Sequence, residues 1–180
     1  IATAYHMVKG MEKFYFNDHI NRKIIYLKFL ADYKKYDLAL LQVESRYFDR
    51  EYKELDINNY DLSERIKKEE SVTIIGFPNG SFTKIQGTLI SQEDFLRTSF
   101  VEKRTLRTFI FHLIVDKEFL LIKTDSKKDL RGLSGSPVIS KEEEFLGILV
   151  GGSQVIPVIA YTPVERLRNL VIKTLEHFSN

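Results

Sequence analysis

A tight turn around one serine is the feature of this sequence with the clearest chemistry. In RGLSGSPVIS, residues 131–140, Ser134 lies between Gly132 and Gly135 and precedes a proline and a short apolar run. Glycine tolerates backbone angles that a side chain forbids, so the N–H groups of Gly132 and Ser134 can point to one spot beside the hydroxyl. Such donors could hold a developing oxyanion, and removing one commonly costs ~3–4 kcal/mol. The turn therefore predicts a nucleophile with an oxyanion hole.

A serine hydroxyl needs an imidazole base, and that imidazole needs a carboxylate to orient it. Asp37 begins the apolar segment DLALLQV, and an acid at the mouth of a buried strand needs a partner. His6, in IATAYHMV, is the candidate base. We interpret the remaining three histidines as structural: His19, His112 and His177. The simpler alternative is that Asp37 only caps its strand and Ser134 only makes a turn.

Three short segments resemble the His, Asp and Ser motifs of trypsin-like serine proteases, and they occur in the order of that family: TAYH, DLALL and GLSGSPV. Two longer stretches are similar to its bacterial branch, which includes the HtrA-type and glutamyl-endopeptidase-type enzymes: GFPNGSFTKIQGTLIS and LIKTDSKKDLRGLSGSPVI. An α/β-hydrolase would run Ser, acid, His and would have a glycine where this chain has Ser136. The resemblance covers nearly the whole chain and implies the triad His6, Asp37 and Ser134.

The resemblance also implies where a polypeptide substrate binds. The strand around Leu149, Val150, Gly151 and Gly152 would pair with an extended substrate backbone. The residues that fall at the base of the primary specificity pocket are Lys128 and Asp129. Glutamate-specific relatives have a histidine where Leu149 stands. We therefore predict a pocket that accepts an apolar or a basic side chain and disfavours an acidic one.

Two departures from the family pattern concern activation and the start of the fold. Family members that are activated by clipping carry an aspartate before the nucleophile, which pairs with a new N-terminal amine. Leu133 stands at that position and cannot pair with an ammonium, so Ile1 is not interpreted as such a terminus. Only IATAY precedes His6, where relatives have one or two strands. We expect a first barrel that is cut short, or upstream residues that belong to a larger protein.

The elements that must position these residues are short strands. Eight segments are rich in β-branched and aromatic residues and are separated by turn residues, which favours an antiparallel barrel or sandwich. They are KIIYLKFLAD, YDLALLQVE, SVTIIGFP, FTKIQGTLIS, RTFIFHLIVD, FLLIKTD, EFLGILVGG and QVIPVIAYT. One amphipathic helix is predicted at the C-terminus, with Thr162 as N-cap and Pro163 at its first position. Its apolar residues recur at helical spacing: Val164, Leu167, Val171, Leu175 and Phe178.

Composition excludes several classes of function. The 180 residues are 43% hydrophobic, which fits one globular domain with a sizeable core. A net charge of +2, evenly spread, argues against nucleic acid as the main ligand. The chain contains no cysteine, so disulfides, thiolate metal sites and thiol nucleophiles are excluded. No apolar run reaches the ~18 residues of a membrane span. No metal or organic cofactor is expected, and the compartment is left open.

The predicted fold class is therefore all-β: a double six-stranded antiparallel barrel with a C-terminal α-helix, the first barrel incomplete. We expect the first barrel and its connection in 1–70, the second barrel in 71–162 and the helix in 163–180. The predicted function is that of a serine endopeptidase. Two alternatives stay open, namely a protease domain gated by a regulatory domain or partner upstream, and a silent pseudoprotease that only binds a partner.

Overall fold

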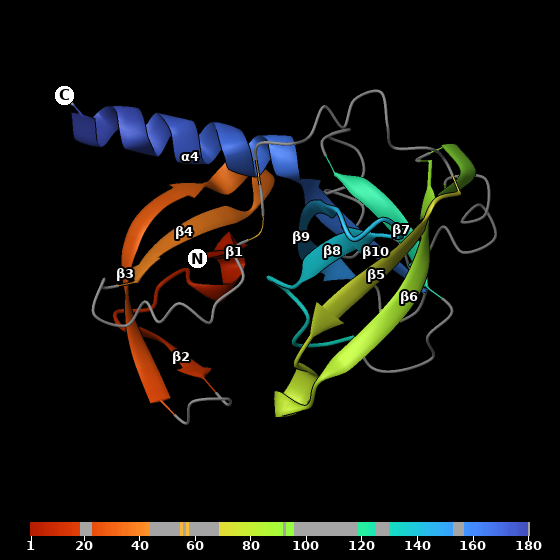
Figure 1. Cartoon of the computed structure of the whole chain (residues 1–180), viewed down its shortest axis with the longest axis horizontal. Helices are drawn as coiled ribbons and strands as arrows, with labels where there is room; N and C mark the ends of the chain where they lie inside the picture. The colour runs from red at the N-terminus through yellow and green to blue at the C-terminus, as the bar shows by residue number, and fades with distance from the viewer. Residues whose placement is uncertain are drawn as a thin grey trace.

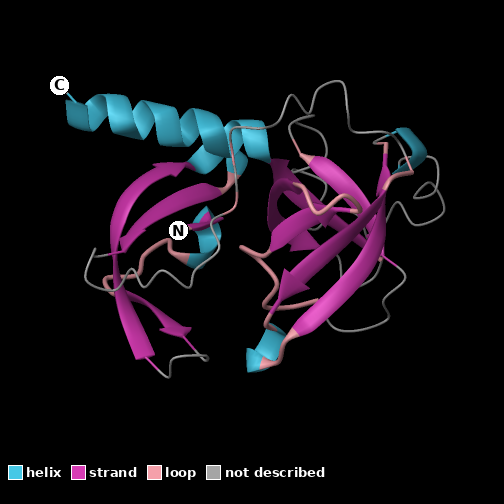
Figure 2. Ribbon diagram, viewed as in Figure 1, coloured by secondary structure: helices cyan, strands magenta, loops and turns pink. Residues whose placement is uncertain are grey.

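The computed structural model describes residues 1–18, 23–43, 55, 57, 69–91, 93–95, 119–124, 130–152 and 157–179. An open sheet from the N-terminal part of the chain lies beside a closed barrel from the C-terminal part, and one long helix crosses above the open sheet (Figure 1). Strands dominate both halves, as Figure 2 shows. The predicted all-β fold, with a closed second barrel, a partial first barrel and a C-terminal helix, is confirmed.

The open sheet has the strand order β1-β4-β3-β2 within the described residues. Its strands are β1 (Ala2–Ala4), β2 (Phe14–Asp18), β3 (Lys23–Tyr33) and β4 (Leu38–Val43). Two single-turn 3-10 helices interrupt it, η1 (Tyr5–Met7) after β1 and η2 (Lys34–Tyr36) before β4. All three pairings are antiparallel. Both 3-10 turns therefore lie at the same end of the β1–β4 pair.

The closed barrel has the strand order β10-β7-β6-β5-β8-β9. Its strands are β5 (Ser71–Gly76), β6 (Thr83–Ile90), β7 (Leu120–Thr124), β8 (Pro137–Ser140), β9 (Phe145–Gly152) and β10 (Val158–Pro163), with a 3-10 turn, η4 (Pro78–Gly80), between β5 and β6. Alternate residues of β5 point inward, so Val72 and Ile74 are buried while Ser71 is exposed. This period of two is the pattern by which a strand with one buried face is recognised.

Strand β9 is buried on both faces. Every residue from Phe145 to Val150 is buried, in contrast to the alternation in β5. One face packs in the barrel core, and the other is covered, because β1 and the C-terminal helix both contact β9. Val150 shares an apolar cluster with Ala4 of β1. The interface between the two halves of the molecule therefore runs along β9 and β1.

The C-terminal helix α4 (Val164–Ser179) packs against β9 and β10 of the barrel and against β3 of the open sheet. Its buried residues are Val164, Leu167, Leu170 and Thr174. The predicted apolar face is wrong toward its end, because Leu175 is 61% exposed and Phe178 is 66% exposed. In Figure 1 the far end of α4 extends beyond the strands that it covers. Helical spacing alone does not show where the packing partner stops.

The predicted start of the helix is also wrong. Thr162 and Pro163 belong to strand β10, with Thr162 paired to Ile148 and Pro163 to Gly147. Helix α4 begins one residue later, at Val164. The Thr162 hydroxyl does not cap it but donates to the Tyr36 carbonyl in the other half of the molecule. A tertiary contact has overridden a local capping signal.

Seven of the eight predicted strand segments overlap observed strands, namely β3, β4, β5, β6, β7, β9 and β10. The remaining segment, at 107–116, lies outside the described residues. Three strands were not predicted separately: β1, β2 and β8. They are among the shorter strands. Strand β1 directly precedes the turn that contains His6, and β8 directly follows the turn of Ser134. A window of three to five residues carries too little periodicity to identify a strand.

Candidate active site

The register of the first sheet brings His6 to Asp37. Ala4 at the end of β1 pairs with Leu38 at the start of β4. The next backbone contact continues this register, because the Tyr5 N–H donates to the Asp37 carbonyl at 2.8 Å. His6 follows directly in η1, so its side chain starts beside the carboxylate of Asp37. Two residues that are 31 positions apart in sequence are thus joined by one strand pairing.

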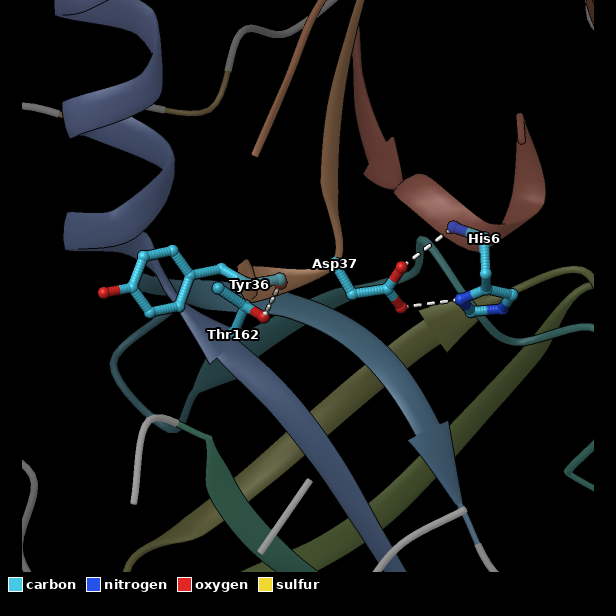
Figure 3. A network of polar contacts seen from close by, with 4 residues as sticks. All are labelled: His6, Tyr36, Asp37 and Thr162. Atoms are coloured by element: carbon cyan, nitrogen blue, oxygen red, sulfur yellow. Dashed lines mark hydrogen bonds and ion pairs between the residues drawn. The ribbon is translucent and has the colours of Figure 1, made fainter. Parts of the chain in front are cut away.

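Both carboxylate oxygens of Asp37 contact His6 (Figure 3). The His6 backbone N–H donates to Oδ1 at 2.8 Å, and the ring Nδ1 lies 2.6 Å from Oδ2. A carboxylate only accepts hydrogen bonds, so Nδ1 carries the hydrogen and the Nε2 of a neutral ring is left as an acceptor. The Asp37 side chain is 13% exposed, against 36% for His6. The acid is therefore largely enclosed, while the histidine is partly exposed.

The backbone of Asp37 adopts an uncommon conformation. Its φ of 51° and ψ of 41° lie in the left-handed region, which aspartate tolerates better than most residues with a side chain. Its N–H donates to the Lys34 carbonyl at 3.1 Å and closes the η2 turn. The turn places the carboxylate at the mouth of β4, as the sequence predicted for an acid that starts a buried strand.

Two glycines in left-handed conformations shape the turn around Ser134. Gly132 has a φ of 84° and Gly135 a φ of 88°. The Ser136 N–H donates to the Leu133 carbonyl at 2.9 Å and closes the turn across Ser134. Within the part of the chain that the structure describes, the N–H groups of Gly132 and Ser134 donate to no backbone carbonyl. These two N–H groups are the ones that the sequence predicts as oxyanion donors.

The Ser134 turn is held from both sides. The Gly135 N–H donates to the Leu149 carbonyl at 2.8 Å, and the Leu149 N–H donates to the Ser136 carbonyl at 2.9 Å, which ties the turn to β9. On the other side Gly135 lies against β1, where a Cβ atom would stand 2.5 Å from Thr3 Oγ1. Thr3 lies in the strand that leads into His6. The turn that carries Ser134 and the strand that leads to His6 are thus in contact.

A methyl group at Gly135 should loosen this contact. We expect Gly135→Ala to lower the free energy of unfolding by ~2–4 kcal/mol, because it adds overlap with Thr3 to the strain of a positive φ. Gly80 is the matched control, since it has a φ of 78° with nothing within 4 Å of a Cβ atom. Gly80→Ala should cost only ~1–2 kcal/mol. Urea denaturation measures both, and equal losses would contradict the contact with Thr3.

Leu133, next to Ser134, and the amine of Ile1 lie in different parts of the molecule. Leu133 is fully buried in the main core cluster and lies against Gly76, where a Cβ atom would stand 2.6 Å from its Cδ2. The Ile1 amine donates to the Leu41 carbonyl at 2.8 Å, within the first sheet. Burial lowers the pKa of this amine. Apolar packing of Leu133 takes the place of an ion pair next to Ser134.

The predicted substrate-binding residues fall in different places. Leu149 and Val150 have buried side chains, and Leu149 contacts the Ser134 turn through its backbone. Gly151 is half-buried and Gly152 is exposed, at the end of β9. Lys128 and Asp129 lie outside the described residues. Sequence reasoning did not identify Thr3 or Gly76, since no local signal marks residues that contact the turn from distant strands.

Neither a cluster of metal ligands nor a helix that could span a membrane is found among the residues that the structure describes. No group of three or more His, Asp or Glu side chains there could hold a metal ion. His177 lies at the end of α4 against Phe178, with ring centroids 6.0 Å apart. His19 and His112 lie outside the described residues. Among the described helices, none is long and apolar enough to cross a membrane.

Comparison with known families gives one match. Residues 1–148 match the family model of the trypsin-like peptidase domain. The chain belongs to this family. The predicted membership of the trypsin-like serine proteases, a family of peptidases, is thereby confirmed. Comparison of this trypsin-like peptidase domain with curated proteins gave no significant match.

Solved structures share the fold of this trypsin-like peptidase domain. A serine endoprotease from Yersinia pestis is 17% identical and has a TM-score of 0.67, covering 97% of this chain and 53% of its own. The Rv3671c protease in an inactive form is also 17% identical, with a TM-score of 0.64, covering 96% of this chain and 77% of its own. The chain thus spans about half the length of the Yersinia structure.

Proposed function

We propose that this domain is a serine endopeptidase whose triad consists of His6, Asp37 and Ser134. The observation that carries the proposal is the double contact between Asp37 and His6, which fixes the ring and makes Nε2 the acceptor nitrogen of the neutral imidazole. The turn of Ser134 adds support, because it contacts the strand that leads to His6 and has glycine at 132 and 135 in the left-handed conformation.

The proposed reaction is acyl transfer in two halves. Ser134 Oγ attacks the scissile carbonyl carbon while His6 Nε2 takes the hydroxyl proton, and the carbonyl oxygen becomes an oxyanion held by Gly132 and Ser134 N–H groups. His6 then gives the proton to the leaving amine, and the C–N bond breaks to leave an acyl-enzyme. Water attacks the ester in the same way and releases the acid. Asp37 stabilises the imidazolium form of His6 in both halves.

For the primary pocket we propose an apolar or basic preference. Leu149 contacts the Ser134 turn through its backbone, and its side chain is apolar and buried in the core, so it offers no hydrogen-bond donor to a carboxylate. A buried carboxylate without a partner is costly, so acidic side chains should be poor substrates. Lys128 and Asp129 remain the proposed residues of the pocket base. Profiling with a peptide library tests this preference, and dominant cleavage after glutamate would refute it.

Substrate pairing along β9 gives a separate prediction. Gly151 is half-buried next to the end of the strand, where a substrate backbone would add to the sheet. We expect Gly151→Phe to raise KM at least ~10-fold, because the ring would occupy the space of the added strand. Steady-state kinetics with a peptide ester measures the change. Gly10→Phe is the control, since Gly10 lies in an open turn of the first sheet; equal KM values for both variants would refute the assignment.

No contact in the described part of the chain favours a gated or a silent domain. Their experimental signature is nevertheless distinct. A silent domain would bind a substrate peptide without reacting with an active-site probe. A gated domain would react only after its partner is added. Covalent labelling of Ser134, described in the Discussion, separates both from a self-sufficient peptidase.

A further inference from the structure

A buried hydrogen bond links the second barrel to the turn that carries Asp37. The Thr162 hydroxyl donates to the Tyr36 carbonyl at 2.6 Å, and the two residues are 126 positions apart (Figure 3). Thr162 is 1% exposed and Tyr36 is 4% exposed, so water does not replace this bond. The carbonyl that accepts it belongs to the peptide group between Tyr36 and Asp37. The bond therefore acts on the residue next to the acid.

The peptide group between Tyr36 and Asp37 is held at both of its polar atoms. Its oxygen accepts from Thr162, and its N–H donates to the Lys34 carbonyl at 3.1 Å. A peptide group is planar, so two opposed hydrogen bonds fix the orientation of the whole plane. This plane contains the N–Cα bond of Asp37, and rotation about that bond gives the φ of 51°. The direction of the Asp37 side chain follows from it.

Contacts of the Tyr36 ring, one of them from helix α4, strengthen the same link. The Arg166 guanidinium lies 4.6 Å from the centroid of the Tyr36 ring, and Lys35 lies 5.5 Å from it. The Tyr33 ring meets the Tyr36 ring edge-on, with centroids 4.4 Å apart. Thr162 lies near the end of β10 and Arg166 in the first turn of α4, while Tyr36 lies in the η2 turn beside the first sheet. Tyr36 is thus packed from the half of the molecule that carries Ser134.

We propose that Thr162 is a positioning residue for Asp37, an inference that rests on the proposed function. Through the Tyr36 carbonyl, its hydroxyl holds the Asp37 carboxylate in line with His6 Nδ1 and couples the acid to the barrel of the nucleophile. Thr162 touches neither substrate nor the reacting atoms, so its loss should slow the chemical step without weakening substrate binding.

A pair of identical substitutions tests the proposal. Thr162→Val keeps the shape and removes the donor. Thr174→Val is the matched control, because Thr174 is also buried and its hydroxyl also donates to a backbone carbonyl, Leu170, at 2.7 Å within α4. We expect Thr162→Val to lower kcat ~10- to 100-fold with KM unchanged, since a small misplacement of a catalytic group has effects of this size. Thr174→Val should lower thermal stability to a similar extent and leave kcat unchanged.

A second readout does not depend on catalysis. The proton between His6 Nδ1 and Asp37 gives a far-downfield resonance in proton NMR when the two atoms are held in a short hydrogen bond. Thr162→Val should broaden this resonance or shift it upfield, while Thr174→Val should leave it in place. If Thr162→Val does not fold, Thr162→Ser and Thr162→Ala replace it, since both lose the methyl group and only the alanine variant loses the donor.

Failure of the positioning role of Thr162 and failure of the proposed peptidase function give different results. Wild-type kcat and resonance in Thr162→Val, or equal behaviour of the serine and alanine variants, would overturn the positioning role. A wild-type chain without the downfield proton would overturn it as well. A wild-type chain that shows the proton but neither cleaves nor labels would instead refute the proposed peptidase, while the NMR comparison still decides the role of Thr162.

Discussion

Replacing Ser134 with alanine is expected to abolish covalent labelling by a fluorophosphonate and to lower kcat by on the order of 10⁶-fold, the usual loss when a triad nucleophile is removed. His6→Ala should reach the same level, because nucleophile and base act as one unit. Mass spectrometry of the labelled protein locates the adduct, and hydrolysis of a peptide ester gives the rates.

Ser136→Ala is the control for this experiment. Ser136 lies in the same turn, and its backbone atoms make the same contacts in either form, to Leu133 and Leu149. Labelling and turnover should both survive in this variant. If the probe reacts equally with wild type and Ser134→Ala, the proposed nucleophile is wrong. If wild type is never labelled, even with candidate partners added, the silent alternative replaces the peptidase.

The second large effect is expected for Asp37→Asn, with a loss of ~10⁴-fold in kcat. Asparagine fits the left-handed backbone of Asp37, so the fold should be kept. Its amide group can donate to His6 Nδ1, which would move the ring hydrogen to Nε2 and remove the acceptor that Ser134 needs. Steady-state kinetics and a thermal melt together separate this chemical defect from a loss of structure.

Asp32→Asn provides the comparison for the acid. Asp32 lies in β3, opposite Ala39 of β4, and is half-buried, whereas Asp37 is buried. The substitution again replaces a carboxylate oxygen with an amide group, but at a residue for which no bond to His6 is observed. Asp32→Asn should keep nearly full activity. Comparable losses in the two variants would mean that the carboxylate of Asp37 has no special role in the reaction.

The contact between His6 and Asp37 could be anticipated from the sequence, but the packing around the Ser134 turn could not. His6, Asp37 and Ser134 each stand in a local pattern with its own chemical meaning, and the structure brings His6 and Asp37 into direct contact. The contact between Gly135 and Thr3 depends instead on how two distant segments pack. No short-range pattern contains that information, because both residues satisfy their local turn or strand without it.

Fold prediction failed where packing decides the outcome. Thr162 followed by Pro163 and Glu165 is a sound local signal for a helix start, yet the hydroxyl is used across the molecule and the strand continues through Pro163. Leu175 has helical spacing but is exposed, because the end of α4 extends beyond the strands against which the helix packs (Figure 1). Strand β9 was correctly predicted from its continuous apolar run, and its two buried faces explain that run.

The bond from Thr162 to Tyr36 also sets an order of events during synthesis. A ribosome makes the chain from its N-terminus at about 5–20 residues per second. The 126 positions between the two residues therefore correspond to a delay of roughly 6 to 25 seconds. If Thr162 holds Asp37 in place, the first sheet emerges without a fixed acid and gains it only when the second barrel is nearly made. The proposed site could therefore cleave growing polypeptides, including the chain to which it belongs, only after that delay.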